Sequence, residues 1–145
     1  MEDLITQYAP HFGILLFGFI VYVVCFGTFG GWKDLATSFK TEQTIKSEKE
    51  MGDCKTQLTL NKSSMKPVTA IPTGDGLYLS FLRRPKLMIP WEKFENLQSK
   101  TTKILSMEVI EYSATIQTLE KDVLIKIPHH VIHFARDHKK LEILE

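Results

Sequence analysis

The sequence predicts an α+β protein: one N-terminal transmembrane helix, followed by a small antiparallel β roll that a C-terminal helix closes. Residues 12–32 carry no charged side chain, the chain from residue 54 onward alternates apolar and polar positions, and the last stretch returns to helical spacing. A period of two is typical of strands and a period of 3.6 of helices. The predicted parts are a tail over 1–11, a transmembrane helix over 12–32, a juxtamembrane amphipathic helix and connector over 33–53, and a β-rich domain with its closing helix over 54–145.

The uncharged segment has the length and composition of a membrane span. About 20 residues with a rise of about 1.5 Å each match the roughly 30 Å hydrocarbon core of a bilayer. A cleavable signal peptide is the competing interpretation, and it needs a basic start and a small-x-small cleavage site. The chain instead begins MEDLITQYAPH, without Lys or Arg, and the segment ends in the bulky string FGTFGGW. We therefore expect the segment to be retained.

The flanking charges predict the orientation of this helix. No Lys or Arg precedes it, whereas Lys33, Lys40, Lys46 and Lys49 follow it closely. An excess of Lys and Arg in short flanks marks the cytoplasmic side of a membrane. The sequence thus predicts a single-pass membrane protein with its N-terminus outside and its soluble domain in the cytoplasm. Trp32 would then lie at the level of the lipid headgroups.

Two glycines near the end of the segment suggest a packing face for another helix. Gly27 and Gly31 are four residues apart, so they share one face of a helix and would allow a second backbone to approach closely. Glycine is also common in membrane helices without this role, and both interpretations stay open. The packing interpretation predicts an integral membrane protein complex as the partner, with the lipid bilayer around the helix.

The β-rich domain consists of short apolar runs separated by turn signals. The runs Leu77–Leu82 and Lys86–Ile89 are joined by a short turn that contains Pro85, which predicts a hairpin. Pro128 is suited to begin the closing helix. Further strands are expected over residues 54–63, 104–114, 115–120 and 123–127.

Three strings in this domain carry a family resemblance. GDGLYLS, PKLMIPW and the following KFENL resemble uncharacterised bacterial single-pass membrane proteins with a small soluble domain similar to a pleckstrin-homology-like roll. The resemblance covers residues 54–138. It implies two sheets of antiparallel strands closed by one C-terminal helix, in a protein of the bacterial inner membrane. Because this fold hosts many unrelated functions, no ligand-binding residue is carried over from it.

Three histidines of the closing helix are the candidate metal ligands. His129 and His133 are four residues apart and His130 and His133 are three apart, so either pair could chelate a metal on one helix face. Zinc sites usually need three or four ligands, and an HExxH motif would add a Glu that is missing. A polar helix surface explains the histidines equally well. We therefore expect no metal and no cofactor, with these histidines as weak candidates only.

Arg83, Arg84 and Lys86 form a basic turn between the two clearest strands. In pleckstrin-homology-like domains a basic first hairpin can meet lipid phosphates, so the resemblance implies possible contact with a lipid or a partner. Three charges on a turn can also serve only solubility and the protection of a sheet edge. Both interpretations stay open.

Charge and motifs limit the possible functions. Without Glu2 and Asp3, 15 of the 17 acidic side chains remain against 18 basic ones, an excess too small to indicate nucleic-acid binding. The catalytic motifs of the common enzyme classes are missing. We predict a non-enzymatic, membrane-anchored accessory subunit or adaptor that docks on a larger integral membrane complex through its helix and its soluble roll. The alternative is a lipid-headgroup or metal-responsive binding module at the membrane surface.

Overall fold

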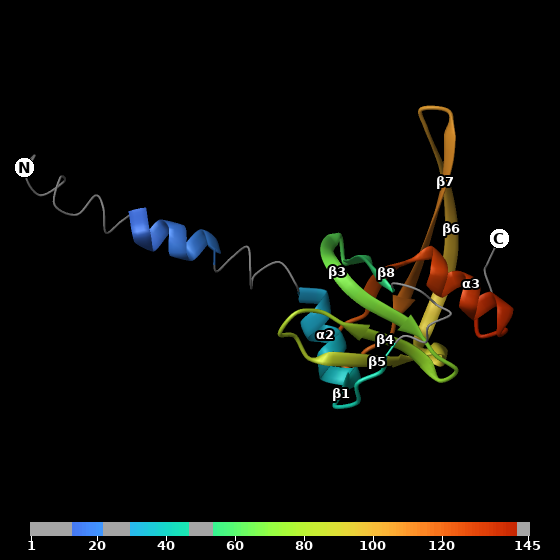
Figure 1. The fold of residues 1–145 in the computed structure, drawn as a ribbon, viewed down its shortest axis with the longest axis horizontal. Helices are drawn as coiled ribbons and strands as arrows, with labels where there is room; N and C mark the ends of the chain where they lie inside the picture. The colour runs from blue at the N-terminus through green and yellow to red at the C-terminus, as the bar shows by residue number, and fades with distance from the viewer. Residues whose placement is uncertain (1–12, 22–29, 47–53, 142–145) are drawn as a thin grey trace, which may run out of the picture. The chain divides into compact units, whose positions relative to one another are not determined.

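The computed structural model describes residues 13–21, 30–46 and 54–141, and the chain divides into two units, Met1–Gly30 and Gly31–Glu145. In the first unit, residues 13–21 form a helix that is exposed along its whole length. In its described residues, the second unit is an antiparallel eight-stranded sheet with two α-helices, of which α3 is drawn in red in Figure 1.

From Gly30 onward, an α-helix comes first, the strands follow with one short 3-10 helix among them, and a second α-helix comes last. In chain order they are α2 (Gly30–Phe39), β1 (Lys40–Thr41), β2 (Lys55–Leu60), β3 (Ser63–Pro72), β4 (Gly76–Ser80), β5 (Lys86–Pro90), the 3-10 helix η3 (Trp91–Lys93), β6 (Phe94–Ile104), β7 (Met107–Ile116), β8 (Val123–Ile127) and α3 (His129–Asp137).

The sheet has the strand order β1-β5-β4-β3-β2-β8-β7-β6. Its two halves, β1 to β5 and β6 to β8, meet where β2 pairs with β8. Only Thr59 and Leu60 of β2 have register partners in β8. Asn61 extends this junction, because its backbone N–H donates to the carbonyl oxygen of Leu124 at 2.9 Å and its side-chain Oδ1 accepts from the Leu124 N–H at 2.8 Å.

The core follows from the alternation of apolar residues along the strands. In β8, Val123, Ile125 and Ile127 are buried and the residues between them are exposed. One face of α3 covers the core with Val131, Ile132 and Ala135, as expected for an amphipathic surface helix. The side chains that are most completely buried come from both halves of the sheet and both helices: Trp32, Tyr78, Leu35, Leu58, Leu60, Leu77, Leu79, Leu87, Ile89, Ile116, Ile125 and Ile132.

The structure contradicts the predicted transmembrane helix. Among the described residues, no helix is both long enough and apolar enough to cross a membrane. At about 1.5 Å per residue, the helix over 13–21 and α2 are each about half the length that a span of roughly 30 Å requires. Residues 22–29 lie outside the described residues. The predictions of a membrane helix over residues 12–32, of a single-pass membrane protein and of a membrane localisation are therefore wrong.

Trp32 illustrates the reason for this correction. It was expected at a lipid headgroup level, but it is 1% exposed and packs inside the second unit. Its ring lies 5.8 Å from that of Phe81, and its Nε1–H donates to the carbonyl oxygen of Pro85 at 3.1 Å. Leu35, one helical turn later, is also buried. The apolar face at the end of the hydrophobic run therefore packs against the sheet.

Gly31 has a role in the same contact. A Cβ atom at this position would approach the Cβ of Leu60 to 2.9 Å, which is too close for an ordinary contact. Glycine thus lets the first turn of α2 approach β2 near its junction with β8. Gly27, the other glycine of the predicted packing face, lies outside the described residues.

Two further expectations about the fold are corrected. The strands form one continuous sheet rather than a roll of two sheets behind a membrane helix. The strand predicted over residues 104–114 is interrupted, because β6 ends at Ile104 and β7 begins at Met107. The amphipathic helix predicted within residues 33–53 corresponds to α2, although its apolar face contacts protein.

We predict that Trp32→Ala will lower the free energy of unfolding by about 3 to 5 kcal/mol, because it removes a large buried ring and leaves a cavity. Denaturant titration of the full chain, monitored by circular dichroism, measures this change. The matched control is Leu119→Ala, since Leu119 is 83% exposed and its truncation should change stability by less than about 0.5 kcal/mol. Equal effects of the two substitutions would contradict the placement of α2 in the core.

Candidate interaction surface

The hairpin formed by β6 and β7 projects well beyond the rest of the sheet (Figure 1). The strand β8 pairs with β7 only from Tyr112 to Ile116, so it supports the base of the hairpin. Beyond that point, residues 98–111 are exposed throughout, and in the described part of the chain β6 pairs with β7 alone. We call residues 98–111 the outer hairpin. An isolated two-stranded hairpin is marginally stable in water, which makes this projection a costly feature.

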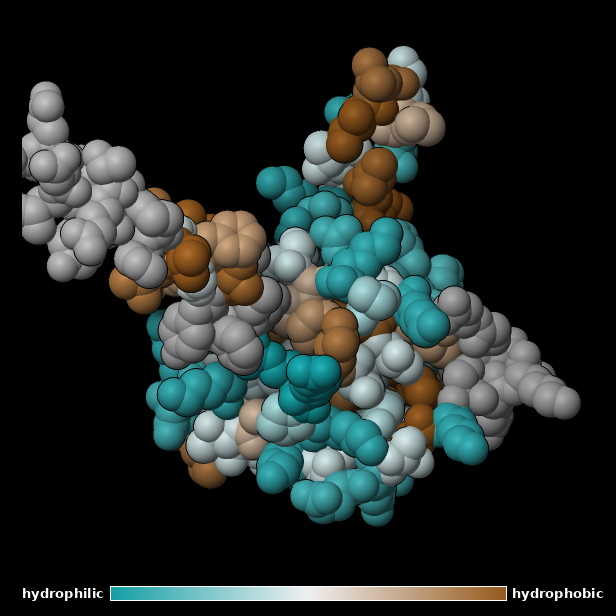
Figure 2. Space-filling view, turned by 60° about the vertical axis from the view of Figure 1, so that its left-hand side comes forward, coloured by the Kyte–Doolittle hydropathy of each residue, from teal (hydrophilic) through white to brown (hydrophobic). Residues whose placement is uncertain are grey.

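The end of the outer hairpin is apolar. Leu105 is 90% exposed, and its neighbours are large apolar side chains that are also exposed. Figure 2 shows several brown, hydrophobic side chains on the projection, at its end and further down, beside hydrophilic ones. Exposed apolar residues are ordinary when they occur singly, but a gathered group is typical of an interaction site. We call this group the hairpin tip, and it consists of Ile104, Leu105, Met107, Val109 and Ile110.

The turn at the tip has an unfavourable backbone for its sequence. Leu105 and Ser106 have φ values of 46° and 69°, so both lie in the left-handed region. Two-residue hairpin turns with this geometry strongly favour Asn and Gly. A residue such as Leu in this region costs about 1 to 2 kcal/mol. Leu105 therefore combines an exposed apolar side chain with a backbone conformation that another residue would adopt more easily.

The charges of the outer hairpin are balanced. Lys103 and Glu108 face each other across the strands, with Nζ and Oε1 3.4 Å apart. Lys100 lies opposite Glu111 in the register, and the Glu111 carboxylate also accepts from Lys126 at 2.9 Å. Attraction to anionic lipids requires an excess of Lys and Arg near the membrane surface. The outer hairpin has no such excess.

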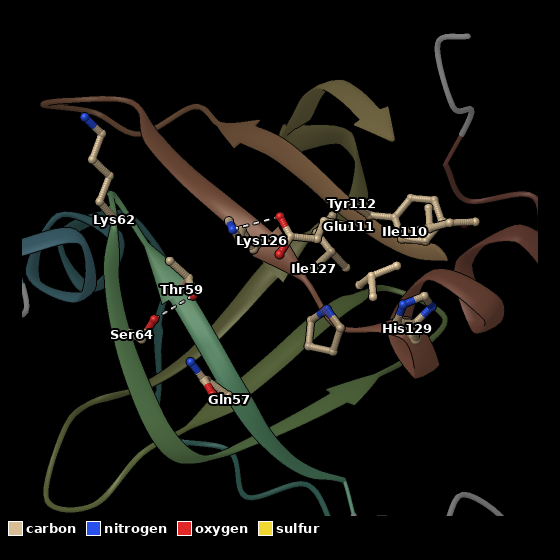
Figure 3. Close-up of a pocket in the computed structure, with 12 residues that line it drawn as sticks. Gln57, Thr59, Lys62, Ser64, Ile110, Glu111, Tyr112, Lys126, Ile127 and His129 are labelled. Atoms are coloured by element: carbon tan, nitrogen blue, oxygen red, sulfur yellow. Dashed lines mark hydrogen bonds and ion pairs between the residues drawn. The ribbon is translucent and has the colours of Figure 1, made fainter. Parts of the chain in front are cut away.

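A hollow of about 570 Å³ lies at the foot of the hairpin, and we call it the foot hollow. Figure 3 shows that its walls come from β2, β3, β7, β8 and the start of α3. On one side the hydroxyl groups of Thr59 and Ser64 are 2.9 Å apart. On the other side Tyr112 and His129 form an edge-on ring contact, with centroids 5.6 Å apart. The hollow thus combines polar groups with aromatic walls.

The three candidate histidines have separate surroundings. His130 donates from Nε2 to the carbonyl oxygen of Ala70 at 2.8 Å, which fixes α3 to β3. His129 contacts Tyr112, and the rings of His129 and His133 are 6.4 Å apart. Within residues 13–21, 30–46 and 54–141, no group of three or more His, Cys, Asp or Glu side chains is placed to hold a metal ion. His130 therefore has a structural contact, and the metal interpretation gains no support.

The three basic residues of the turn between β4 and β5 have different surroundings. Arg83 is exposed, but Lys86 donates from Nζ to the hydroxyl of Thr44. Arg84 is half-buried, and its backbone N–H donates to the carbonyl oxygen of Phe81 at 3.0 Å. Leu82, beside them, is an exposed apolar residue. The contact with lipid or partner that was predicted for this turn stays a prediction.

Sequence reasoning missed both the hairpin tip and the foot hollow. The string ILSM at residues 104–107 was interpreted as part of one strand, because it contains no Gly, Pro, Asn or Asp and its single Ser is a weak turn signal. The foot hollow draws on segments far apart in the chain, so no local pattern predicts it. The Leu105-Ser106 pair between two alternating runs was the one available signal.

Comparisons with protein-family models, with curated proteins and with solved structures find no match for this chain. The resemblance to bacterial proteins with a pleckstrin-homology-like domain therefore stays a prediction. Any functional conclusion must come from the surface of the chain itself.

We predict that His130→Ala will lower the free energy of unfolding by about 1 kcal/mol, because it removes the hydrogen bond to Ala70. Denaturant titration measures this loss. His133→Ala is the matched control on the same helix, since His133 is exposed and should contribute less than about 0.5 kcal/mol. Adding equimolar zinc should leave the midpoints of all three proteins unchanged. A zinc-dependent rise that both substitutions abolish would restore the metal interpretation.

Proposed function

We propose that this chain is a non-enzymatic adaptor that binds a larger protein assembly through its hairpin tip. The observation that carries the proposal is Leu105, an apolar side chain that is 90% exposed on a backbone with φ of 46°. Strained backbone conformations concentrate at functional sites. The exposed side chain and the strained backbone of this one residue both lower the folding stability, and the free energy of binding can offset that loss.

The tip has the composition of an interface centre. Burying an exposed side chain such as Leu or Met gains about 1.5 to 3 kcal/mol, and a few residues of this kind usually dominate a protein interface. Leu105, Met107 and Ile104 stand at the end of a projection, where they can enter a cleft. The partner surface that fits is therefore an apolar cleft.

The charges around the tip favour a protein over a lipid surface as the partner. Lys103 and Glu108 present one cation and one anion beside the tip. A protein rim can complement both signs, whereas an anionic leaflet attracts only the cation. The alternative of a lipid-headgroup or metal-responsive module has no comparable support in the described residues.

The non-enzymatic part of the proposal rests on the sequence, in which the catalytic motifs of the common enzyme classes are missing.

A substitution at the tip separates binding from stability. Leu105→Asn replaces an apolar residue with one that tolerates positive φ, so it should leave the free energy of unfolding unchanged or raise it by about 0.5 to 1 kcal/mol. The same change should weaken partner binding about tenfold or more, because it removes a residue at the centre of the interface. A photo-crosslinking residue in place of Ser106 identifies the partner in cells, and titration calorimetry with the purified partner measures the affinity.

Leu119→Asn is the matched control, because Leu119 is a similarly exposed leucine (83% against 90% for Leu105) in the loop between β7 and β8. It should leave the affinity within about twofold of the wild type. The proposal fails when Leu105→Asn and Leu119→Asn bind the partner equally well. It also fails when Leu105→Asn destabilises the chain and affinity falls only in proportion to the unfolded fraction.

A further inference from the structure

The foot hollow opens where β2 separates from β8. Only Thr59 and Leu60 of β2 pair with β8, whereas Thr56 and Leu58 have register partners in β3 alone. The strand β8 ends at Ile127, after which the chain enters α3. The edge of β2 that faces β8 is therefore open over Thr56–Leu58 in the described structure, and the hollow lies beside it (Figure 3).

The backbone of β2 presents a donor along this edge. The N–H of Asn61 points toward β8, since it donates to Leu124. Backbone groups along an antiparallel strand point alternately to its two sides, so the N–H of Thr59 and that of Gln57 point the same way as that of Asn61. The N–H of Thr59 therefore points to β8, with which Thr59 pairs, whereas the N–H of Gln57 points to the hollow that Gln57 lines. An extended segment that entered the hollow could accept a hydrogen bond from Gln57.

The walls of the hollow are suited to alternating side chains. Tyr112 and His129 supply a ring surface, and Pro128 lies beside them. Gln57, Thr59 and Ser64 supply polar groups from the opposite side. Recognition by strand addition uses main-chain hydrogen bonds for affinity and pockets for alternate side chains for specificity. At this site Gln57 supplies a main-chain donor, and the rings and the polar groups supply two different walls.

The charge of the lining favours an acidic ligand. Its charged residues are Lys62, Lys126 and Glu111, and the last two form an ion pair at 2.9 Å. No ion pair is described for Lys62, which is exposed at the turn between β2 and β3. An acidic side chain beside Lys62 would therefore gain attraction without competing against an existing partner.

We infer that the foot hollow is a second binding site, which takes an extended acidic peptide segment of another protein as an added strand along Thr56–Leu58 of β2. The acidic residue lies beside Lys62, and apolar or aromatic residues at alternate positions lie against Tyr112 and His129. This site is separate from the hairpin tip, so it adds a second partner surface to the proposed adaptor and does not depend on Leu105.

The probe is a phage-displayed library of random 12-residue peptides, selected on the immobilised full chain. The selected peptides are then synthesised and their affinities measured by fluorescence anisotropy. We expect peptides that carry Asp or Glu at one end and apolar residues at alternate positions. Gln57→Pro removes the N–H that donates to the added strand, and Pro is tolerated at an open sheet edge. It should weaken binding about tenfold or more, whereas Gln57→Ala, which keeps the N–H, should stay within about twofold.

A charge reversal tests the site by a second route. Lys62→Glu should weaken binding about fivefold or more at low salt, with a smaller loss at 0.5 M salt because exposed charges are screened. Lys121→Glu, at another exposed lysine, should have little effect, and Leu105→Asn should bind the peptides like the wild type. If circular dichroism shows that Gln57→Pro is unfolded, the affinity of Lys62→Glu and its salt dependence test the inference instead.

Four results would overturn the inference. They are selection of no peptide, selection of peptides without acidic residues, equal losses from Gln57→Pro and Gln57→Ala, and binding that only Leu105→Asn removes. The last result would assign the peptides to the hairpin tip and leave the proposed function standing. Conversely, a variant that loses the partner of the hairpin tip but still binds the peptides would leave the inference about the foot hollow standing.

Discussion

The short junction between β2 and β8 is the constraint on which the rest of the second unit depends. It joins the two halves of the sheet through Thr59, Leu60 and the hydrogen bonds of Asn61 to Leu124. Gly31 allows the first turn of α2 to pack against this point, and the apolar face of α2 then closes the core. Because the junction is so short, the strands separate on one side of it, and that separation opens the foot hollow.

The same arrangement explains why the hairpin of β6 and β7 extends beyond the part of β7 that pairs with β8. The last strand, β8, covers β7 only from Tyr112 onward, so residues 98–111 rest on their own pairing. A chain selected for stability alone would shorten this projection or place Asn-Gly in its turn. The presence of Leu105 at the tip is understandable when binding offsets its cost to folding stability, since natural sequences depart from local rules mainly at functional sites.

Local patterns predicted much of the sheet and little of the interaction surface. Alternating burial in Val123–Ile127 and the hairpin of Leu77–Leu82 with its neighbour are visible in sequence, because one buried face imposes a period of two. The environment of Trp32 could not be predicted from the sequence. Hydropathy indicates that a residue favours apolar surroundings, but it does not distinguish a bilayer from a protein core. The turn at Leu105 and Ser106 contains no Gly, Pro, Asn or Asp, so one strand was expected across it. The foot hollow depends on contacts between distant segments, which no single-sequence pattern encodes.

Amide hydrogen exchange on the full chain, alone and bound to the partner identified by cross-linking, tests most directly whether the hairpin tip is an interface. In the free chain, amides of residues 101–109 should exchange rapidly, because only the pairing within the hairpin protects them. On binding, their exchange should slow about tenfold or more, while α3 remains unchanged. Slowing confined to the turn at Arg83 and Arg84, or no change along the hairpin, would contradict the assignment of the tip as the interface.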